Sequence, residues 1–128
     1  MSHFHAVVWL DHQKATAWQF SATEQQSTVS HAKGQHERIH SHKSAHGGHR
    51  AGADHAFFED VIKSLAGAGE ILVMGPAQTK LEFVKFLEAR HPPLAKLIVA
   101  VENADHPTDA QVLAHARKHF AAIDRMMS

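Results

Sequence analysis

The chain has 128 residues, of which 44% are hydrophobic and 20% charged, and its formal net charge is zero when the histidines are neutral. We therefore expect one soluble globular domain over residues 1–128, without the global field that draws a basic protein to nucleic acid. The absence of cysteine excludes disulfides and zinc sites with thiolate ligands. No apolar run approaches the roughly 20 residues of a membrane span, and no secretory signal is visible. These features predict a cytoplasmic protein with no membrane contact.

Three short β-type segments open the chain. The apolar run Phe4–Leu10 and the alternating run Ala15–Phe20 are separated by a polar tetrapeptide, which is typical of a β-hairpin. After a second polar turn, Ser27–Ala32 is a weaker strand candidate. Together these segments predict an antiparallel meander, with Trp9 and Trp18 in its core.

A segment rich in histidine and glycine follows at residues 33–53. Half of the 14 histidines of the chain lie between His31 and His55. Ordinary linkers are rich in serine, glycine and proline, and they do not concentrate a metal-capable side chain that titrates near neutral pH. Because Ile39 is the only apolar anchor of this segment, we predict a flexible loop inserted into the domain.

Beyond this loop the apolar residues change to helical spacing. We predict a helix with Asp54 as its N-cap and Gly67 as its stop. Its spacing gives one apolar face, made by Phe57, Phe58, Val61, Ile62 and Leu65.

Two strands and two helices complete the predicted elements. Glu70–Met74 and Lys96–Val101 are almost wholly apolar, which is typical of strands buried on both faces. Thr79–Glu82 and Thr108–Gln111 match the capping box, in which two side chains satisfy backbone N–H groups at a helix start. The first of these helices is expected to end near His91, before two prolines, and the second to run through Val112, Leu113, Ala116, Phe120 and Ile123.

This order of elements, β-β-β-loop-α-β-α-β-α, predicts an α/β fold. The βα units of the second half imply parallel pairing with right-handed crossovers. The first half supplies antiparallel strands, so a single mixed β-sheet with helices packed on it is the economical architecture.

Several segments resemble a known group of translation proteins. Gly47–Arg50, His55–Phe58 and Ile71–Phe83 resemble the middle domain of the archaeal and eukaryotic class 1 release factors and of Pelota. In that domain a mixed sheet is interrupted by a loop, and a helix, a strand ending in Gly-Pro and a helix opening with Thr/Ala-Lys follow. The resemblance is strongest over residues 47–87, and it implies a translational-machinery-component fold of the RNase H-like type.

The closing part of the chain extends this resemblance. His91–Lys96 and Glu102–Asp109 are similar to segments of small bacterial single-domain proteins described as translational machinery proteins. The codon-reading and partner-binding domains of the release factors have no counterpart in the sequence, so stop-codon-dependent peptide release is not expected.

The resemblance also implies a role for the glycine pair. In the release factors the loop carries Gly-Gly-Gln, whose glycines let it enter the peptidyl-transferase centre and whose glutamine helps to position the hydrolytic water. Here Gly47 and Gly48 are followed by His49, which can donate and accept hydrogen bonds but differs in shape and can be charged. The resemblance therefore implies a non-catalytic or weakly catalytic module that binds the ribosome or tRNA.

The chemistry of the loop agrees with RNA contact. Basic side chains neutralise phosphates, glycine permits close approach of the backbone, and histidine stacks on bases. The predicted RNA- or ribosome-binding residues are Arg38, Lys43, Gly47, Gly48, His49 and Arg50.

Metal binding is the alternative interpretation of the histidines. Imidazole suits zinc, nickel and copper, and the loop contains histidines four residues apart. No aspartate or cysteine at a matching spacing completes a closed site, so adventitious binding of zinc or nickel is expected more readily than a fixed centre. The candidate ligands are His40, His42, His46 and His49, and no other cofactor is expected.

Other site chemistries find little support in the sequence. There is no nucleophile elbow and no phosphate-binding loop. A nuclease would need the carboxylates of Asp11, Glu59, Asp60 and Glu102 to converge, and nothing in their spacing requires it. In the last helix, two histidines flank the apolar face and are expected at its boundary with one hydrogen bond each, namely His115 and His119. The oligomeric state is left open.

Overall fold

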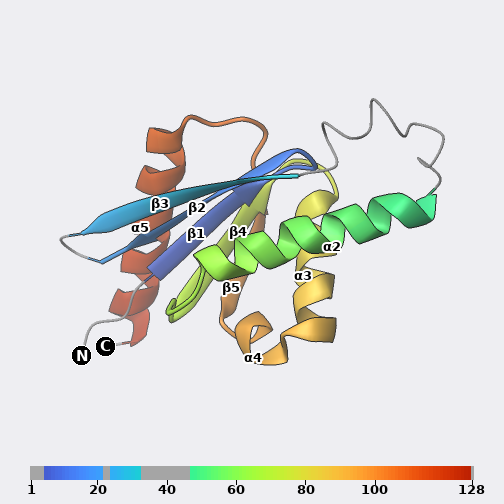
Figure 1. Cartoon of the computed structure of the whole chain (residues 1–128). Helices are drawn as coiled ribbons and strands as arrows, with labels where there is room; N and C mark the ends of the chain where they lie inside the picture. The colour runs from blue at the N-terminus through green and yellow to red at the C-terminus, as the bar shows by residue number, and fades with distance from the viewer. Residues whose placement is uncertain (1–4, 22–23, 33–46, 128) are drawn as a thin grey trace.

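The structure is a computed structural model that describes residues 5–21, 24–32 and 47–127 (Figure 1). Its strands form one five-stranded sheet in the order β3-β2-β1-β4-β5. The strands are β1 (His5–Leu10), β2 (Lys14–Phe20), β3 (Gln25–His31), β4 (Glu70–Gly75) and β5 (Ile98–Asn103).

The pairing of the strands confirms the predicted mixed sheet. β1 and β2 form an antiparallel hairpin, β2 pairs antiparallel with β3, and β1, β4 and β5 run parallel to one another. The hairpin turn is closed by Asp11, whose Oδ1 accepts hydrogen bonds from the backbone N–H groups of Gln13 (2.8 Å) and Lys14 (2.9 Å). This is the local bonding for which aspartate is favoured in turns.

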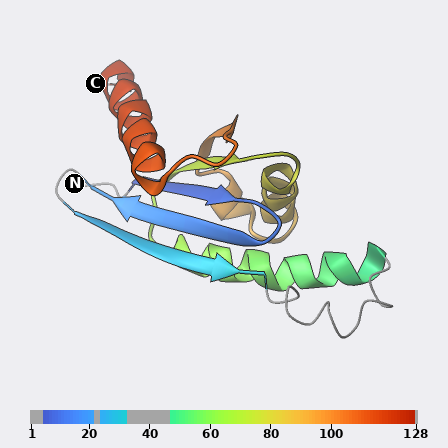
Figure 2. The same ribbon diagram turned by 90° about the horizontal axis from the view of Figure 1, so that it is seen from above.

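The helices cover both faces of the sheet. α2 (Gly47–Ser64) and α3 (Thr79–Arg90) pack on one face, and α5 (Asp109–Met127) packs on the other (Figures 1 and 2). A short helix, α4 (Pro92–Ala95), links α3 to β5 and was not expected from the sequence. None of the helices in the described part of the chain is long and apolar enough to cross a membrane.

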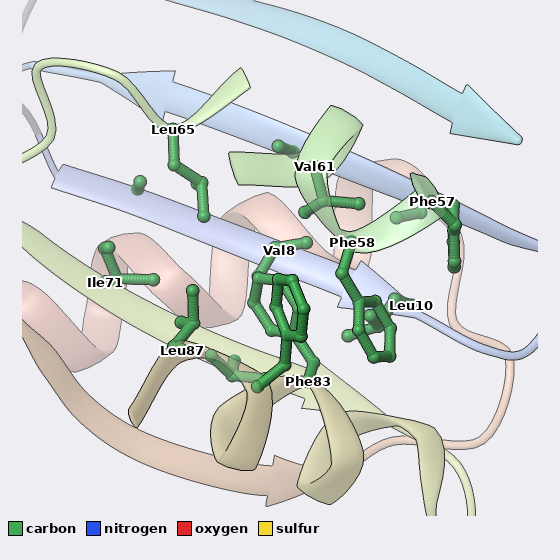
Figure 3. Packing of buried hydrophobic residues seen from close by; sticks show 14 of the residues in the cluster. Val8, Leu10, Phe57, Phe58, Val61, Leu65, Ile71, Phe83 and Leu87 are labelled. Atoms are coloured by element: carbon green, nitrogen blue, oxygen red, sulfur yellow. The ribbon is translucent and has the colours of Figure 1, made fainter. Parts of the chain in front are cut away.

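Two hydrophobic cores lie on opposite sides of the central strands. The core under α2 and α3 is rich in phenylalanine and branched side chains (Figure 3). The core under α5 contains both tryptophans, together with Phe20 and Phe120. Because β1 and β4 contribute to both cores, nearly all of their residues are buried, as the apolar run Glu70–Met74 predicts. Burial of both tryptophans confirms their expected place in the core.

The expectation that Lys96–Val101 is buried on both faces is wrong. β5 begins only at Ile98, and its residues alternate between half-buried and exposed. The cause is its position as the last strand of the sheet, with a register irregularity where it meets β4. The apolar residues that precede it, Leu94, Ala95 and Leu97, pack against the core from α4 and the turn after it.

The two predicted capping boxes have different outcomes. Thr108 and Gln111 bond reciprocally: the Thr108 N–H donates to Gln111 Oε1 (2.9 Å), and the Gln111 N–H donates to Thr108 Oγ1 (3.1 Å). The predicted box at Thr79 is wrong, because the N-cap of α3 is Gln78 and no side chain caps the helix. The chain turns one residue earlier than expected, at Ala77, whose φ is 53°.

Candidate functional site

The start of α2 holds the described part of the predicted RNA-binding segment. Gly47, Gly48, His49 and Arg50 form the first turn of this helix. The other predicted residues, Arg38 and Lys43 for RNA and His40, His42 and His46 for metal, lie outside the described residues. The structure therefore gives the backbone position of one end of the segment.

The expectation of a loop that continues to residue 53 is wrong for residues 47–53. The sequence predicts Asp54 as the N-cap, whereas α2 already begins at Gly47. Arg50, Ala51 and Ala53 favour a helix, but three glycines in the same stretch disfavour it, so intrinsic propensity does not explain the early start. The glycine pair thus lies in helical backbone, and the tight turn otherwise typical of Gly-Gly is not formed.

The second half of α2 anchors the helix to the body of the protein. Phe57, Phe58, Val61 and Leu65 are almost fully buried in the core beneath it. Figure 3 shows these side chains among the other core residues, with Phe58 next to Phe83 of α3. In two perpendicular views the first turns of α2 extend past the ends of the strands and past α3 (Figures 1 and 2). The Gly47–Arg50 backbone is therefore held away from the core.

Contacts between α2 and α3 fix the direction of this projection. The His55 ring lies 4.9 Å from the Phe86 ring, and the Phe58 ring lies 5.3 Å from that of Phe83. One turn further along α2, both carboxylate oxygens of Glu59 lie 3.1 Å from Nε2 of His91, the residue that caps the end of α3. These contacts join α2 to α3. They therefore set the direction of the arm, by which we mean the first turns of α2 that carry Gly47.

The carboxylates considered for a nuclease site do not converge. Asp11, Glu59 and Glu102 each lie beside a different histidine. Within the described residues, no group of three or more histidine, aspartate or glutamate side chains is arranged to hold a metal ion. The geometry therefore supports no two-metal chemistry in this part of the chain.

Histidine–carboxylate pairs between different elements were not expected from the sequence. Their partners are 13 to 95 residues apart, so neither spacing nor motif reveals them. His106 illustrates the arrangement: its Nδ1 is 3.0 Å from Asp105, its Nε2 is 3.7 Å from Asp11, and its ring lies over Trp9. The pairs that join separate parts of the described chain include His5–Glu70, His91–Glu59, His106–Asp11, His115–Glu102 and His119–Glu102.

The Gly-Pro turn after β4 is shaped by close packing at the carboxyl ends of the parallel strands. A Cβ at Gly75 would collide with the carbonyl oxygen of Leu10, so only glycine fits where β4 leaves the sheet. The amine of Lys80, a buried side chain, donates to the carbonyl oxygen of Ala77 and holds the turn. The Gly-Pro and Thr-Lys residues of the resemblance therefore shape the link from β4 to α3.

Solved structures show the same arrangement of strands and helices. Pelota from Archaeoglobus fulgidus superposes with a TM-score of 0.61 over 90% of this chain, at 15% sequence identity. Pelota from Thermoplasma acidophilum has a TM-score of 0.59 over 88% of this chain, at 16% sequence identity. The archaeal translation termination factor aRF1 has a TM-score of 0.57 over 97% of this chain, also at 16% identity.

The chain has the fold of a domain of Pelota and aRF1. It spans only 31% of the length of either Pelota and 40% of aRF1, so the likeness concerns one part of those proteins. No family model and no curated protein matches the sequence. The fold expected from the resemblance, a single mixed sheet with helices packed on it, is confirmed by the likeness to Pelota and aRF1.

Proposed function

We propose that this protein is a non-catalytic or weakly catalytic translation-associated module, which contacts ribosomal RNA or tRNA through the residues at and before the start of α2. One observation carries the proposal. In a fold shared with Pelota and a translation termination factor, α2 carries Gly47 and Gly48 on an arm that extends beyond the sheet. The sequence resemblance implies that these glycines correspond to those of Gly-Gly-Gln in the release factors, and the proposal rests on that correspondence.

The residue types of the segment suit an RNA partner. Arg38, Lys43 and Arg50 supply positive charge for phosphates, while the glycines add no side chain between backbone and ligand. Such contacts release counterions, so binding by this segment is expected to weaken as salt is raised. The overall charge of zero means that this attraction is local to the segment.

Charge reversal at the two ends of α2 tests the proposal with a matched pair of variants. Arg50→Glu alters the projecting end, and Lys63→Glu alters an exposed residue in the last turn of the same helix. In co-sedimentation with ribosomes at low salt, we expect Arg50→Glu to lower the bound fraction about fivefold or more, given the usual cost of losing a phosphate contact and gaining repulsion. Lys63→Glu should bind as the wild type does.

Two results would contradict the proposal. One is a wild-type protein that stays in the supernatant at low salt and in every growth phase. The other is equal loss of binding in both variants, which would place the contact elsewhere on the molecule. Circular dichroism of the two variants confirms that each still folds.

A further inference from the structure

The outer edge of the sheet carries a cluster of three titratable side chains that the proposed function does not use. Glu102 of β5 lies between two histidines of α5: its Oε1 is 2.6 Å from Nε2 of His115, and its Oε2 is 3.8 Å from Nδ1 of His119. The two imidazole rings are 6.4 Å apart. All three side chains are partly exposed, so protons exchange freely with solvent.

This cluster joins α5 to the edge strand. The apolar contacts of the helix, through Val112, Ala116 and Phe120, belong to the core formed with β1, β2 and β4. β5 contributes only Ala100 to the margin of that core, and it has a neighbouring strand on one side only. Glu102 therefore joins β5, the edge strand of the sheet, to α5.

We propose that Glu102, His115 and His119 form a proton-dependent clamp that fastens α5 to the edge of the sheet more firmly in mild acid than at neutral pH. A neutral imidazole offers the carboxylate one N–H group. An imidazolium carries a proton on both ring nitrogens and adds an ion pair, so the same carboxylate holds it more strongly. Histidine is the side chain whose charge changes in mild acid, so the clamp is compared at pH 7.5 and pH 5.5.

The carboxylate determines the sign of the effect. With Glu102 present, each added proton places a positive charge beside a negative one. Without it, protonation leaves two positive rings about 6 Å apart with no negative charge between them. Mild acid is therefore expected to hold α5 more firmly against the sheet in the wild type and less firmly in a Glu102→Gln variant.

Other charged groups around α5 must be separated from the clamp. His5 of β1 stacks on Phe120 at 4.4 Å and lies 3.2 Å from Glu70 of β4, so it forms a second histidine–carboxylate pair beside the helix. Arg117 lies over Phe20 and donates to the carbonyl oxygen of Ser21 and to Gln25, but a guanidinium keeps its charge throughout this range. A comparison of variants at two pH values removes the contribution of His5, since it is common to all of them.

The two tryptophans of the chain make the test direct, because Trp9 and Trp18 both lie in the core that α5 covers. Urea unfolding followed by tryptophan fluorescence at pH 7.5 and pH 5.5 gives the folding equilibrium constant of the wild type and of Glu102→Gln. The ratio of the two constants should rise about threefold between these pH values, which is the size expected for partly exposed pairs. Glu88→Gln, at an exposed position of α3, is the control. The ratio of the wild-type constant to the Glu88→Gln constant should be the same at both pH values.

A ratio that is the same at both pH values, or that falls in acid, overturns the clamp. Should Glu102→Gln fail to fold, His115→Gln removes the shorter contact and keeps the carboxylate. His115→Gln should lose most of the stability that the wild type gains at pH 5.5. Hydrogen exchange should agree: the α5 amides of the wild type should gain more protection in acid than those of the variant. Wild-type α5 amides that exchange equally at both pH values, after correction for intrinsic rates, would also refute the proposal.

Discussion

Single residues at the ends of β1 and β4 decide how the chain enters α3. Gly75 lies against the backbone of Leu10, and the following turn places Ala77 in the left-handed region, a conformation that non-glycine residues rarely adopt. The sequence shows Gly-Pro as a break after a strand. It does not show that the glycine touches another strand, because that contact depends on the pairing of β1 with β4.

Gly75→Ala is expected to destabilise the protein by about 3 kcal/mol, since a methyl group must displace backbone rather than a mobile side chain. Gly67→Ala is the control: Gly67 has a φ of 87°, but nothing lies within 4 Å of its missing Cβ. It should cost only about 1 kcal/mol for the left-handed backbone. Urea unfolding measures both, and an equal or larger loss for Gly67→Ala would contradict the close packing at Gly75.

In the proposed correspondence with the release factors, His49 takes the place of the glutamine of Gly-Gly-Gln. Because the glutamine that positions water is absent, wild-type protein is expected to give little hydrolysis of peptidyl-tRNA on ribosomes. His49→Gln restores the Gly-Gly-Gln triplet and tests whether the rest of the segment is competent. We expect peptide release to rise about tenfold or more, in the range that one positioned catalytic group contributes. Faster release by the wild type than by the variant would contradict a non-catalytic role.

The N-termini of α3 and α5 show which features the local sequence determines and which depend on the fold. The box at Thr108 and Gln111 forms as predicted because both partners lie within four residues of each other. The same pattern at Thr79 fails, because the turn at Ala77 makes Gln78 the N-cap and leaves Thr79 inside the helix. A capping motif therefore predicts a helix start only where the preceding turn permits it.

Replacing the two threonines with alanine tests this difference. Thr108→Ala removes an N-cap that bonds to Gln111 and should cost about 1 kcal/mol. Thr79→Ala replaces a residue of the first helical turn with a better helix former and should change the stability by a few tenths of a kcal/mol at most. Thermal or urea unfolding of both variants provides the comparison, and a larger loss for Thr79→Ala would be the opposite of what the caps require.

The edge strand and α2 show the limits of reading elements from composition. The run Lys96–Val101 resembles a buried strand, but its first two residues lie between α4 and β5, and the strand itself lies at the edge of the sheet. α2 starts at Gly47 although Asp54 is a good N-cap, and the three glycines of residues 47–53 mean that helix propensity does not explain this start. In both cases the element type is correct and only its limits differ from the prediction.

For the whole molecule, the order of strand-like and helix-like hydrophobic patterns along the chain is enough to predict one mixed sheet with helices packed on it, as the structure shows. Contacts between distant side chains do not follow from that order: His106 meets Asp11 across 95 residues, and nothing in either local sequence indicates it. Among the described residues, the histidines that lie beside carboxylates of the fold are His5, His91, His106, His115 and His119.

The central claim, that α2 presents the Gly-Gly-His segment to RNA, is tested most directly by site-specific crosslinking. A photoreactive amino acid is placed at position 49 in one variant and at position 63, at the other end of the same helix, in a second. With purified ribosomes under ultraviolet light, the protein carrying the probe at 49 should crosslink to ribosomal RNA or tRNA and that with the probe at 63 should not. Equal crosslinking from both positions, or none from position 49, would contradict the claim.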